Sequence, residues 1–183
     1  MDDIVKAALK KWPNVPDCYG WLALDARGDW YMRDDRVQAA GPFPQVKGSR
    51  IEHDKLREFI ARNYEADDRG AWFFQNGPQR VYVELEAAPL VWRLQAVPGA
   101  APQVHSHVGR AARCDAAWLD EFDRLYLSSD LGLGIVHTLD MEAAADAVEQ
   151  GVWTPETTTV AALAARHGVL LSPQRSVGGA AHG

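Results

Sequence analysis

The chain has 183 residues, of which 47% are apolar and 24% are charged, a composition typical of a globular protein with a sizeable core. Its formal net charge of −6 disfavours nucleic-acid binding, because neutralising phosphates needs a concentrated basic surface. No stretch approaches the about 20 apolar residues that a membrane span needs, so we expect no membrane association. Cys18 and Cys114 lie far apart in the sequence without CxxC spacing, which argues against a disulfide scaffold and favours a protein of the reducing cytoplasm. The frequent use of Ala and Arg indicates a bacterial protein.

The first half of the chain alternates helical and strand patterns. Residues 2–12 carry apolar side chains at helical spacing, with Asp2 or Asp3 as the N-cap. The following "YGWLALD" predicts a strand that turns into "DWYMRD". "IEHDKLREFIARNYE" predicts a second helix, opened by His53 or Asp54. Two further strands, "AWFFQ" and "RVYVELE", follow it and are joined through "NGP".

One phrase occurs twice in this half. "DARGDWYMRDDRV" and "DDRGAWFFQNGPQRV" both read Asp-x-Arg-Gly-x-Trp, and each follows a predicted helix. We therefore predict a duplicated helix-plus-hairpin unit, with antiparallel hairpins over residues 19–37 and 64–83. Gly28 and Gly70 should take the positive φ of equivalent turn positions. The alternative is coincidence in a chain rich in Arg, Asp and Gly.

The second half has a different order of elements. "RLYLSSDLGLGIVHTLD" predicts a hairpin about Asp130-Leu131-Gly132, and "DMEAAADAVEQG" predicts a helix between Asp140 and Gly151. The predicted fold class is α+β with mostly antiparallel sheets, duplicated in its N-terminal part and hairpin-plus-helix in its C-terminal part. We expect regions at 1–97 and 103–173 and a disordered tail at 174–183. One continuous domain is the alternative.

Alternation along three predicted strands places polar side chains on one face. If the strands "RVYVELE", "LVWRLQ" and "VHSHV" are neighbours, this face carries a set of cationic, aromatic and titratable side chains: Arg80, Tyr82, Arg93, His105 and His107, with Arg110 nearby. Such a face could recognise an anionic small molecule or a protein partner. The alternative is the solvated side of an antiparallel sheet.

Motifs for chemistry are weak. His105 and His107 have no properly spaced third ligand, so we expect no metal site, and no motif indicates a cofactor or a catalytic residue. Glu84 and Glu86 are interpreted as solvated surface carboxylates. The prediction is a non-catalytic cytoplasmic binding or regulatory protein, with a homodimer left open. The alternative is an enzyme of unidentified class whose site assembles from scattered His, Asp, Glu and Arg residues.

Two segments carry a family resemblance. At "FFQNGPQRVYVELEAAPLVWRL" and "SDLGLGIVHTLDMEAAADAVEQGVW" the chain resembles a family of uncharacterised proteobacterial proteins, over roughly residues 1–173. It resembles more distantly a second such family, over roughly residues 20–110, in which an acidic residue followed by Ala-Pro stands in the place of "VELEAAP". The distant resemblance implies an α+β fold of repeated small motifs and a suggested signalling or ligand-sensing role. It implies no site residue.

Overall fold

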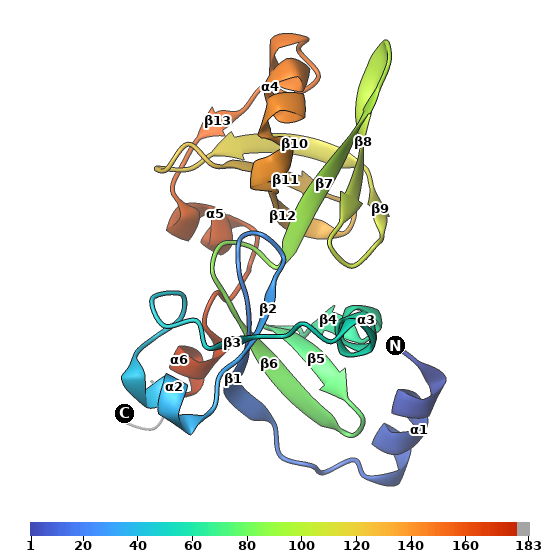
Figure 1. Ribbon diagram of the computed structural model, residues 1–183, viewed down its shortest axis with the longest axis vertical. Helices are drawn as coiled ribbons and strands as arrows, with labels where there is room; N and C mark the ends of the chain where they lie inside the picture. Colours follow the sequence, from blue (N-terminus) through green and yellow to red (C-terminus); the bar gives the residue numbers. More distant parts are fainter. Residues whose placement is uncertain (179–183) are drawn as a thin grey trace. The chain divides into compact units, whose positions relative to one another are not determined.

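The structure is a computed structural model in which residues 1–178 are described. It contains two compact units, drawn with their elements labelled in Figure 1. Unit 1 comprises Met1–Asp25, Asp29–Glu86 and the chain from Val169 onward, and unit 2 comprises Ala26–Gly28 and Ala87–Gly168. The α+β class with mostly antiparallel sheets is confirmed.

Unit 1 is built on a six-stranded sheet of order β3-β2-β1-β6-β5-β4. Its strands are β1 (Cys18–Leu24), β2 (Trp30–Met32), β3 (Ser49–Arg50), β4 (Tyr64–Ala66), β5 (Trp72–Asn76) and β6 (Gln79–Leu85). The central pair, β1 and β6, is parallel, and all other neighbours are antiparallel. Tyr82, Val83, Glu84 and Leu85 are all buried, so both faces of β6 are covered at its C-terminal end.

Within residues 1–178, four helices accompany this sheet: α1 (Asp3–Lys11), α2 (Asp35–Ala40), α3 (Asp54–Arg62) and α6 (Pro173–Gly178). His53 caps α3, since its Nδ1 accepts a hydrogen bond from the Leu56 N–H. Asp34 caps α2 in the same way through the Val37 N–H. Figure 1 shows α2 and α6 side by side next to β1, although about 130 residues separate them in sequence.

Unit 2 is built on a seven-stranded sheet of order β13-β10-β11-β12-β7-β8-β9. Its strands are β7 (Leu90–Val97), β8 (Ala100–Ser106), β9 (Ala111–Ala112), β10 (Cys114–Leu119), β11 (Leu125–Ser129), β12 (Gly132–Val136) and β13 (Glu156–Thr157). The short helix η1 (Thr138–Asp140) leads into α4 (Met141–Glu149), and α5 (Val160–Arg166) follows β13. Buried Trp92 packs against Gly134, where a Cβ would collide with the indole, and its Nε1 donates to the Leu127 carbonyl at 2.9 Å.

The two sheets share one arrangement of strands. In unit 1 the meanders β1-β2-β3 and β4-β5-β6 meet where the first strand runs parallel to the sixth. In unit 2 the meanders β7-β8-β9 and β10-β11-β12 meet in the same way, with β7 parallel to β12. The repetition in this chain therefore extends from the predicted hairpins to whole sheets.

The predicted repeat of the two hairpin turns is confirmed. In turns 25–29 and 67–71 the first residue donates its N–H to the carbonyl of the last, at 3.0 and 2.9 Å. The Oδ1 of that first aspartate accepts the N–H of the last residue, at 2.9 and 3.0 Å. Gly28 and Gly70 occupy the same fourth position, with φ of 82° and 79°. This is a three-residue hairpin loop whose last residue is left-handed.

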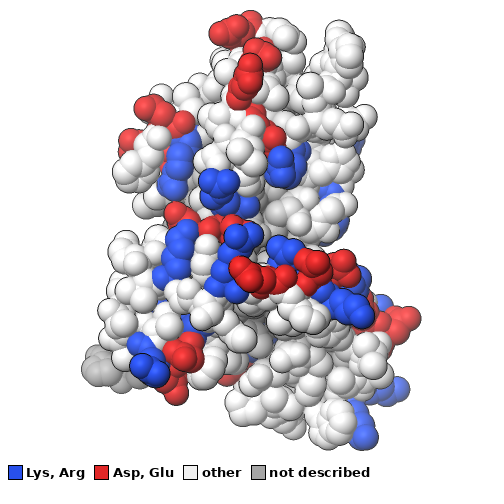
Figure 2. Space-filling model, viewed as in Figure 1, with Lys and Arg blue, Asp and Glu red and all other residues white. Residues whose placement is uncertain are grey.

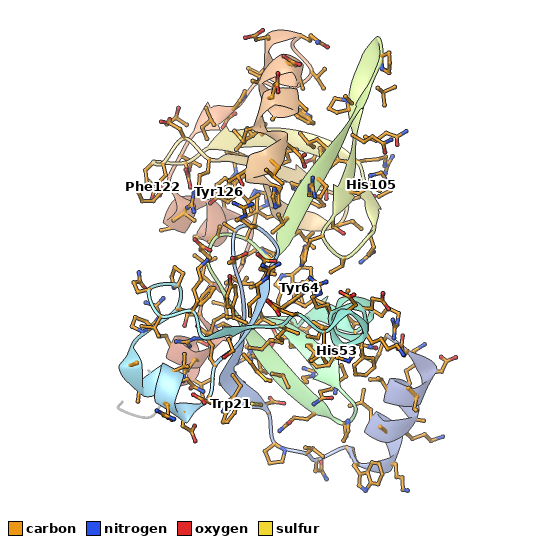
Figure 3. The ribbon with its side chains drawn as sticks, viewed as in Figure 1. Trp21, His53, Tyr64, His105, Phe122 and Tyr126 are labelled. Carbon is orange, nitrogen blue, oxygen red and sulfur yellow. The ribbon has the colours of Figure 1, made fainter. Side chains whose placement is uncertain are left out.

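Two further turns in unit 2 have the same construction. In turns 106–110 and 120–124 the first N–H again donates to the last carbonyl, at 2.8 and 3.1 Å. The fourth position has positive φ at Gly109 (81°) and at Asp123 (57°). Tyr126, labelled in Figure 3 with Phe122, donates its hydroxyl to Asp120 Oδ2 at 3.0 Å. The letters of these turns differ from the repeated phrase, so the sequence pattern did not reveal them.

Three expectations need correction or limitation. The units divide the chain after Glu86 and not after residue 97, because β7 pairs with β12 and belongs to the second sheet. The expected region 103–173 also ends too late, since the chain returns to unit 1 at Val169. The tail is not wholly disordered, because residues 173–178 form α6. Residues 179–183 lie outside the described part of the chain.

Within the described residues, no helix has the length and apolar character needed to cross a membrane.

Candidate functional site

The residues predicted to share a binding face lie on two different sheets. Arg80 and Tyr82 are on β6 in unit 1, whereas Arg93 is on β7 and His105 on β8 in unit 2. The expectation that the three strands are neighbours is wrong, because β6 pairs with β1 and β5 while β7 pairs with β8 and β12. Identical alternation in two separate sheets produced the apparent single face.

The unit 1 members of that set are engaged in packing. The Arg80 guanidinium lies over the Phe73 ring, with Cζ 4.5 Å from the ring centroid. Tyr82 is buried, stacks on Tyr19 with ring centroids 4.6 Å apart, and donates its hydroxyl to Asp67 Oδ2 at 3.0 Å. These contacts stabilise the sheet and the 67–71 turn, and they leave Tyr82 no freedom to meet a ligand.

In unit 2, Arg93 and His105 are register partners on adjacent strands, but Arg93 already holds a carboxylate. Its Nε lies 2.6 Å and its Nη2 3.2 Å from the two oxygens of Asp140. Asp140 Oδ2 also accepts the Leu94 N–H at 3.0 Å. Burial raises the pKa of Asp140, but the hydrogen bonds from Arg93 and Leu94 outweigh it and lower the pKa. The charge of Arg93 is therefore neutralised within its own unit.

The two histidines do not form a pair on one strand. His105 lies on β8, where Figure 3 labels it, but the strand ends at Ser106 and His107 is in the following turn. His107 Nδ1 accepts the Val91 N–H at 3.1 Å, and burial lowers the pKa of its imidazole to about 4. Arg110 is exposed at the last position of that turn. Among residues 1–178 no group of three His, Cys, Asp or Glu side chains is placed to hold a metal ion.

A different residue, Arg33, has the most unusual environment in unit 1. Its side chain is buried, with 1% relative exposure, although arginine is rarely buried without a charged partner. Arg33 stands between β2 and α2, where its N–H donates to the Trp21 carbonyl at 2.9 Å and its carbonyl accepts from Gln38 Nε2 at 2.9 Å. Both backbone polar groups of Arg33 are thus hydrogen-bonded, and its side chain is buried within unit 1.

The protein satisfies this guanidinium only in part. Nε donates to the Val46 carbonyl at 3.3 Å, Nη1 to the Gly20 carbonyl at 3.5 Å and Nη2 to the Gly41 carbonyl at 2.7 Å. Arginine has five N–H donors, so one N–H on each Nη atom has no acceptor among the described residues. No carboxylate of the described chain lies within the 4.0 Å of an ion pair with Arg33.

Glu84 is the second charged group at this place. It lies on β6 with 6% relative exposure, so the expectation of a solvated surface carboxylate is wrong for this residue: the C-terminal segment covers its side of the strand. Glu84 Oε1 accepts the Gln174 N–H at 3.0 Å, and its Oε2 accepts no hydrogen bond from residues 1–178. Burial lowers the pKa of Arg33, and the charge of Glu84 opposes that effect.

Both groups line one cavity of about 240 Å³, the Arg33 pocket. Besides Arg33 and Glu84, the cavity is lined by Gln38 of α2, by residues 41–43 of the loop after α2, and by Ser172, Gln174 and Arg175 of the C-terminal segment. Gln38 and Gln174 are joined across α2 and α6 by a 3.0 Å hydrogen bond. Beneath that bond lies Gly20, where a Cβ would come within 2.5 Å of Gln38 Oε1. Gly20 also has a φ of 82°, in the left-handed region that favours glycine.

The charged surface and a second cavity of unit 1 differ from the Arg33 pocket. On the face in Figure 2, Lys and Arg side chains are interspersed with Asp and Glu. A cavity of about 290 Å³ beside β1 is lined mainly by apolar side chains, among them Trp21, which is labelled in Figure 3, Leu22 and Ile60. Its lining contains no Arg, Lys, Asp or Glu. Of the two, the Arg33 pocket has the charged groups that orient a ligand.

Sequence reasoning missed Arg33 and misplaced Glu84. Arg33 is the only cationic residue of "DWYMRD", the segment into which the first predicted strand was expected to turn. Its acceptors are backbone carbonyls of Gly20, Gly41 and Val46, which carry no sequence signal. The glycines at 20 and 41 are the one available hint, since glycine allows close backbone approach.

The chain belongs to the family described as protein of unknown function (DUF2946), whose model matches residues 1–177. The expected membership of an uncharacterised family is thereby confirmed. Among solved structures, the chain is similar to the crystal structure of a DUF1285 family protein from Shewanella baltica OS155, with 20% sequence identity and a TM-score of 0.46. That similarity covers 69% of this chain and 91% of the other. No curated protein matches the chain.

Proposed function

We propose that this member of the DUF2946 family is a non-catalytic binding or regulatory protein that recognises a small organic carboxylate in the Arg33 pocket. The observation that carries the proposal is a buried guanidinium that has, among residues 1–178, no acceptor for two of its N–H groups and no carboxylate within ion-pair distance. We place the protein in the cytoplasm, which its two free cysteines support.

The energetics favour an anionic ligand. A buried charge is costly unless it is paired and hydrogen-bonded, and neutral carbonyls supply hydrogen bonds to Arg33 without supplying charge. A carboxylate bound to the remaining N–H groups would provide both, in charge-assisted hydrogen bonds that are stronger than neutral ones. Arg175 lies exposed in the cavity lining and has no ion pair among the described residues, so it adds positive potential there.

Titration of the purified full-length protein with glutarate, acetate and inorganic phosphate, followed by calorimetry and by amide chemical shifts, tests the proposal. We expect glutarate to bind and to shift the amides of residues lining the pocket. Arg33→Lys keeps the charge but loses the planar fork, so it should weaken binding at least about tenfold.

Two further variants separate binding from folding. Ser172→Leu fills the pocket without removing a charge and should abolish binding while the protein stays folded. Arg36→Gln, on the exposed side of α2, is the matched control and should bind as the wild type does. Wild-type protein that binds none of the three anions, or an Arg33→Lys variant that binds equally well, would overturn the proposal.

A further inference from the structure

We infer that the ligand of the Arg33 pocket carries an ammonium group beside its carboxylate, and that Glu84 receives that ammonium. The inference rests on the proposed function and adds the substrate class: an aminocarboxylate, and in its best form an amino dicarboxylate. The inference is based on Glu84, the second buried charged residue of the pocket, whose presence is not explained by the binding of an anion to Arg33.

Glu84 is as incompletely satisfied as Arg33. A carboxylate has room for about four hydrogen bonds, and the described protein gives Glu84 one, from the Gln174 N–H at 3.0 Å. Glu84 is one of the residues that line the cavity, and its Oε2 has no donor from residues 1–178. Glu84 forms no ion pair with Arg33, since no nitrogen of that guanidinium lies within 4.0 Å of a Glu84 oxygen.

The simplest structural account is that Arg33 and Glu84 compensate each other at a distance. Such compensation does act, because the charge of Glu84 opposes the effect of burial on the pKa of Arg33. It does not occupy the free N–H groups of Arg33 or the free Oε2 of Glu84, which stay available for charge-assisted hydrogen bonds to a ligand. A molecule that carries a carboxylate and an ammonium would satisfy both groups at once.

The charges lining the pocket define the ligand further. Arg33 and Arg175 are positive and Glu84 is negative. Two carboxylates and one ammonium complement these three side chains, which is the charge pattern of an acidic amino acid. A cavity of about 240 Å³ has the volume of roughly eight water molecules at about 30 Å³ each, so it suits a ligand of that size and is too small for a nucleotide or a peptide.

Glutamate and glutarate form a matched pair of probes, because they differ only in the amino group. We expect the wild-type protein to bind L-glutamate at least about tenfold more tightly than glutarate, through the charge-assisted bond to Glu84. Glu84→Gln keeps an oxygen for the Gln174 N–H and removes the negative charge. It should lose most of the preference for glutamate and bind glutarate more tightly, because a negative charge beside the ligand's carboxylates is removed. Glu86→Gln, two residues along and outside the lining, is the control and should keep the preference.

The outcomes distinguish the two proposals. Equal binding of glutamate and glutarate by the wild type, or a preference that survives Glu84→Gln, would overturn the aminocarboxylate assignment and leave the carboxylate-binding function standing. Binding of neither probe would remove the proposed function and this inference with it. Loss of glutarate binding in Glu84→Gln, with amide spectra showing an intact fold, would show that Glu84 shapes the pocket and does not select an ammonium, and would also overturn the assignment.

Discussion

Asp120 and Arg33 are both buried charges, yet the protein treats them in opposite ways. Asp120 accepts hydrogen bonds from the Phe122 N–H, the Arg124 N–H and Nε, and the Tyr126 hydroxyl, all at 3.0 Å or less. Burial raises the pKa of Asp120, but these bonds outweigh it and lower the pKa. In the described part of the chain, Arg33 has three neutral acceptors and no carboxylate within 4.0 Å. Full satisfaction indicates a structural role, and incomplete satisfaction beside a cavity is the feature that indicates a binding role.

His107 should make stability depend on pH. Burial lowers its folded pKa from 6.5 to about 4, so the unfolded chain binds a proton at a higher pH than the folded protein does. The stability associated with neutral His107 is fully present above pH 6.5 and is lost as the pH falls towards 4. The loss is at most about 3 to 4 kcal/mol, because each pKa unit is worth about 1.4 kcal/mol. Urea unfolding measured every half unit between pH 7 and 4 will follow it.

The matched variant for this prediction is His107→Gln, whose amide oxygen can still accept the Val91 N–H. We expect its stability to change less than that of the wild type between pH 6.5 and 4.5. His105→Gln, two residues away on β8, should keep the wild-type slope. The carboxylates Asp67, Asp120 and Asp140 act in a lower window, because their folded pKa values lie below 3.8. An unchanged slope in His107→Gln would contradict the assignment.

At the level of elements, the same turn is used four times with a changing sequence. Turns 25–29 and 67–71 begin with Asp and have Gly at the fourth position, and turn 106–110 begins with Ser. Turn 120–124 has Asp123 at the left-handed position, with φ of 57°. The backbone geometry of the turn is therefore kept in all four cases, although glycine, the residue that best suits the fourth position, is replaced by Asp123 in one of them.

These turns should respond oppositely to exchange at the fourth position. Gly109→Ala has open space for its Cβ, so its cost is conformational, about 1 kcal/mol for a left-handed L-residue. Asp123→Gly should stabilise the protein, because glycine adopts the left-handed region without strain. The gain should be roughly half of 1 kcal/mol, because Asp tolerates this region better than Ala does and because glycine increases the entropy of the unfolded chain. Thermal unfolding of both variants at pH 7 measures the two changes. Destabilisation by Asp123→Gly would mean that the Asp123 side chain stabilises the turn.

The sequence allowed the local turns to be predicted and hid the pairing of distant strands. Asp and Gly at fixed spacing determine a hairpin loop within five residues, so Gly28 and Gly70 could be placed correctly. The parallel pairs β1–β6 and β7–β12 join strands far apart in the chain, and alternation reads the same whatever the neighbour. The Arg33 pocket was equally hidden, because backbone carbonyls and the returning C-terminal segment build it.

At the level of the whole molecule, the two units differ in how the chain completes them. All seven strands of the second sheet come from residues 87–168. Unit 1 needs the chain to return: the Leu85 N–H donates to the Leu171 carbonyl at 2.8 Å, and the Leu170 N–H to the Gly70 carbonyl at 3.0 Å. Leu170 also packs against the buried cluster of Ala71, Phe73 and Tyr82. Unit 1 is therefore a discontinuous fold closed by the last residues described.

Truncation should consequently affect the two units unequally. A chain ending at residue 168 loses the two hydrogen bonds made by Leu170 and Leu171 and the one from the Gln174 N–H to Glu84. At about 1 kcal/mol each, these bonds alone account for roughly 3 kcal/mol of the stability of unit 1, before the packing of Leu170 is counted. Hydrogen exchange should show amide protection lost in β1 and β6 and retained in β11 and β12. A fragment of residues 87–168 should fold with the same protected strands.

Equal protection of β1 in the truncated and full-length chains would show that the returning segment covers unit 1 without stabilising it. In that case the C-terminal walls of the Arg33 pocket could be removed at little cost, and glutarate binding by the truncated chain would measure what those walls contribute.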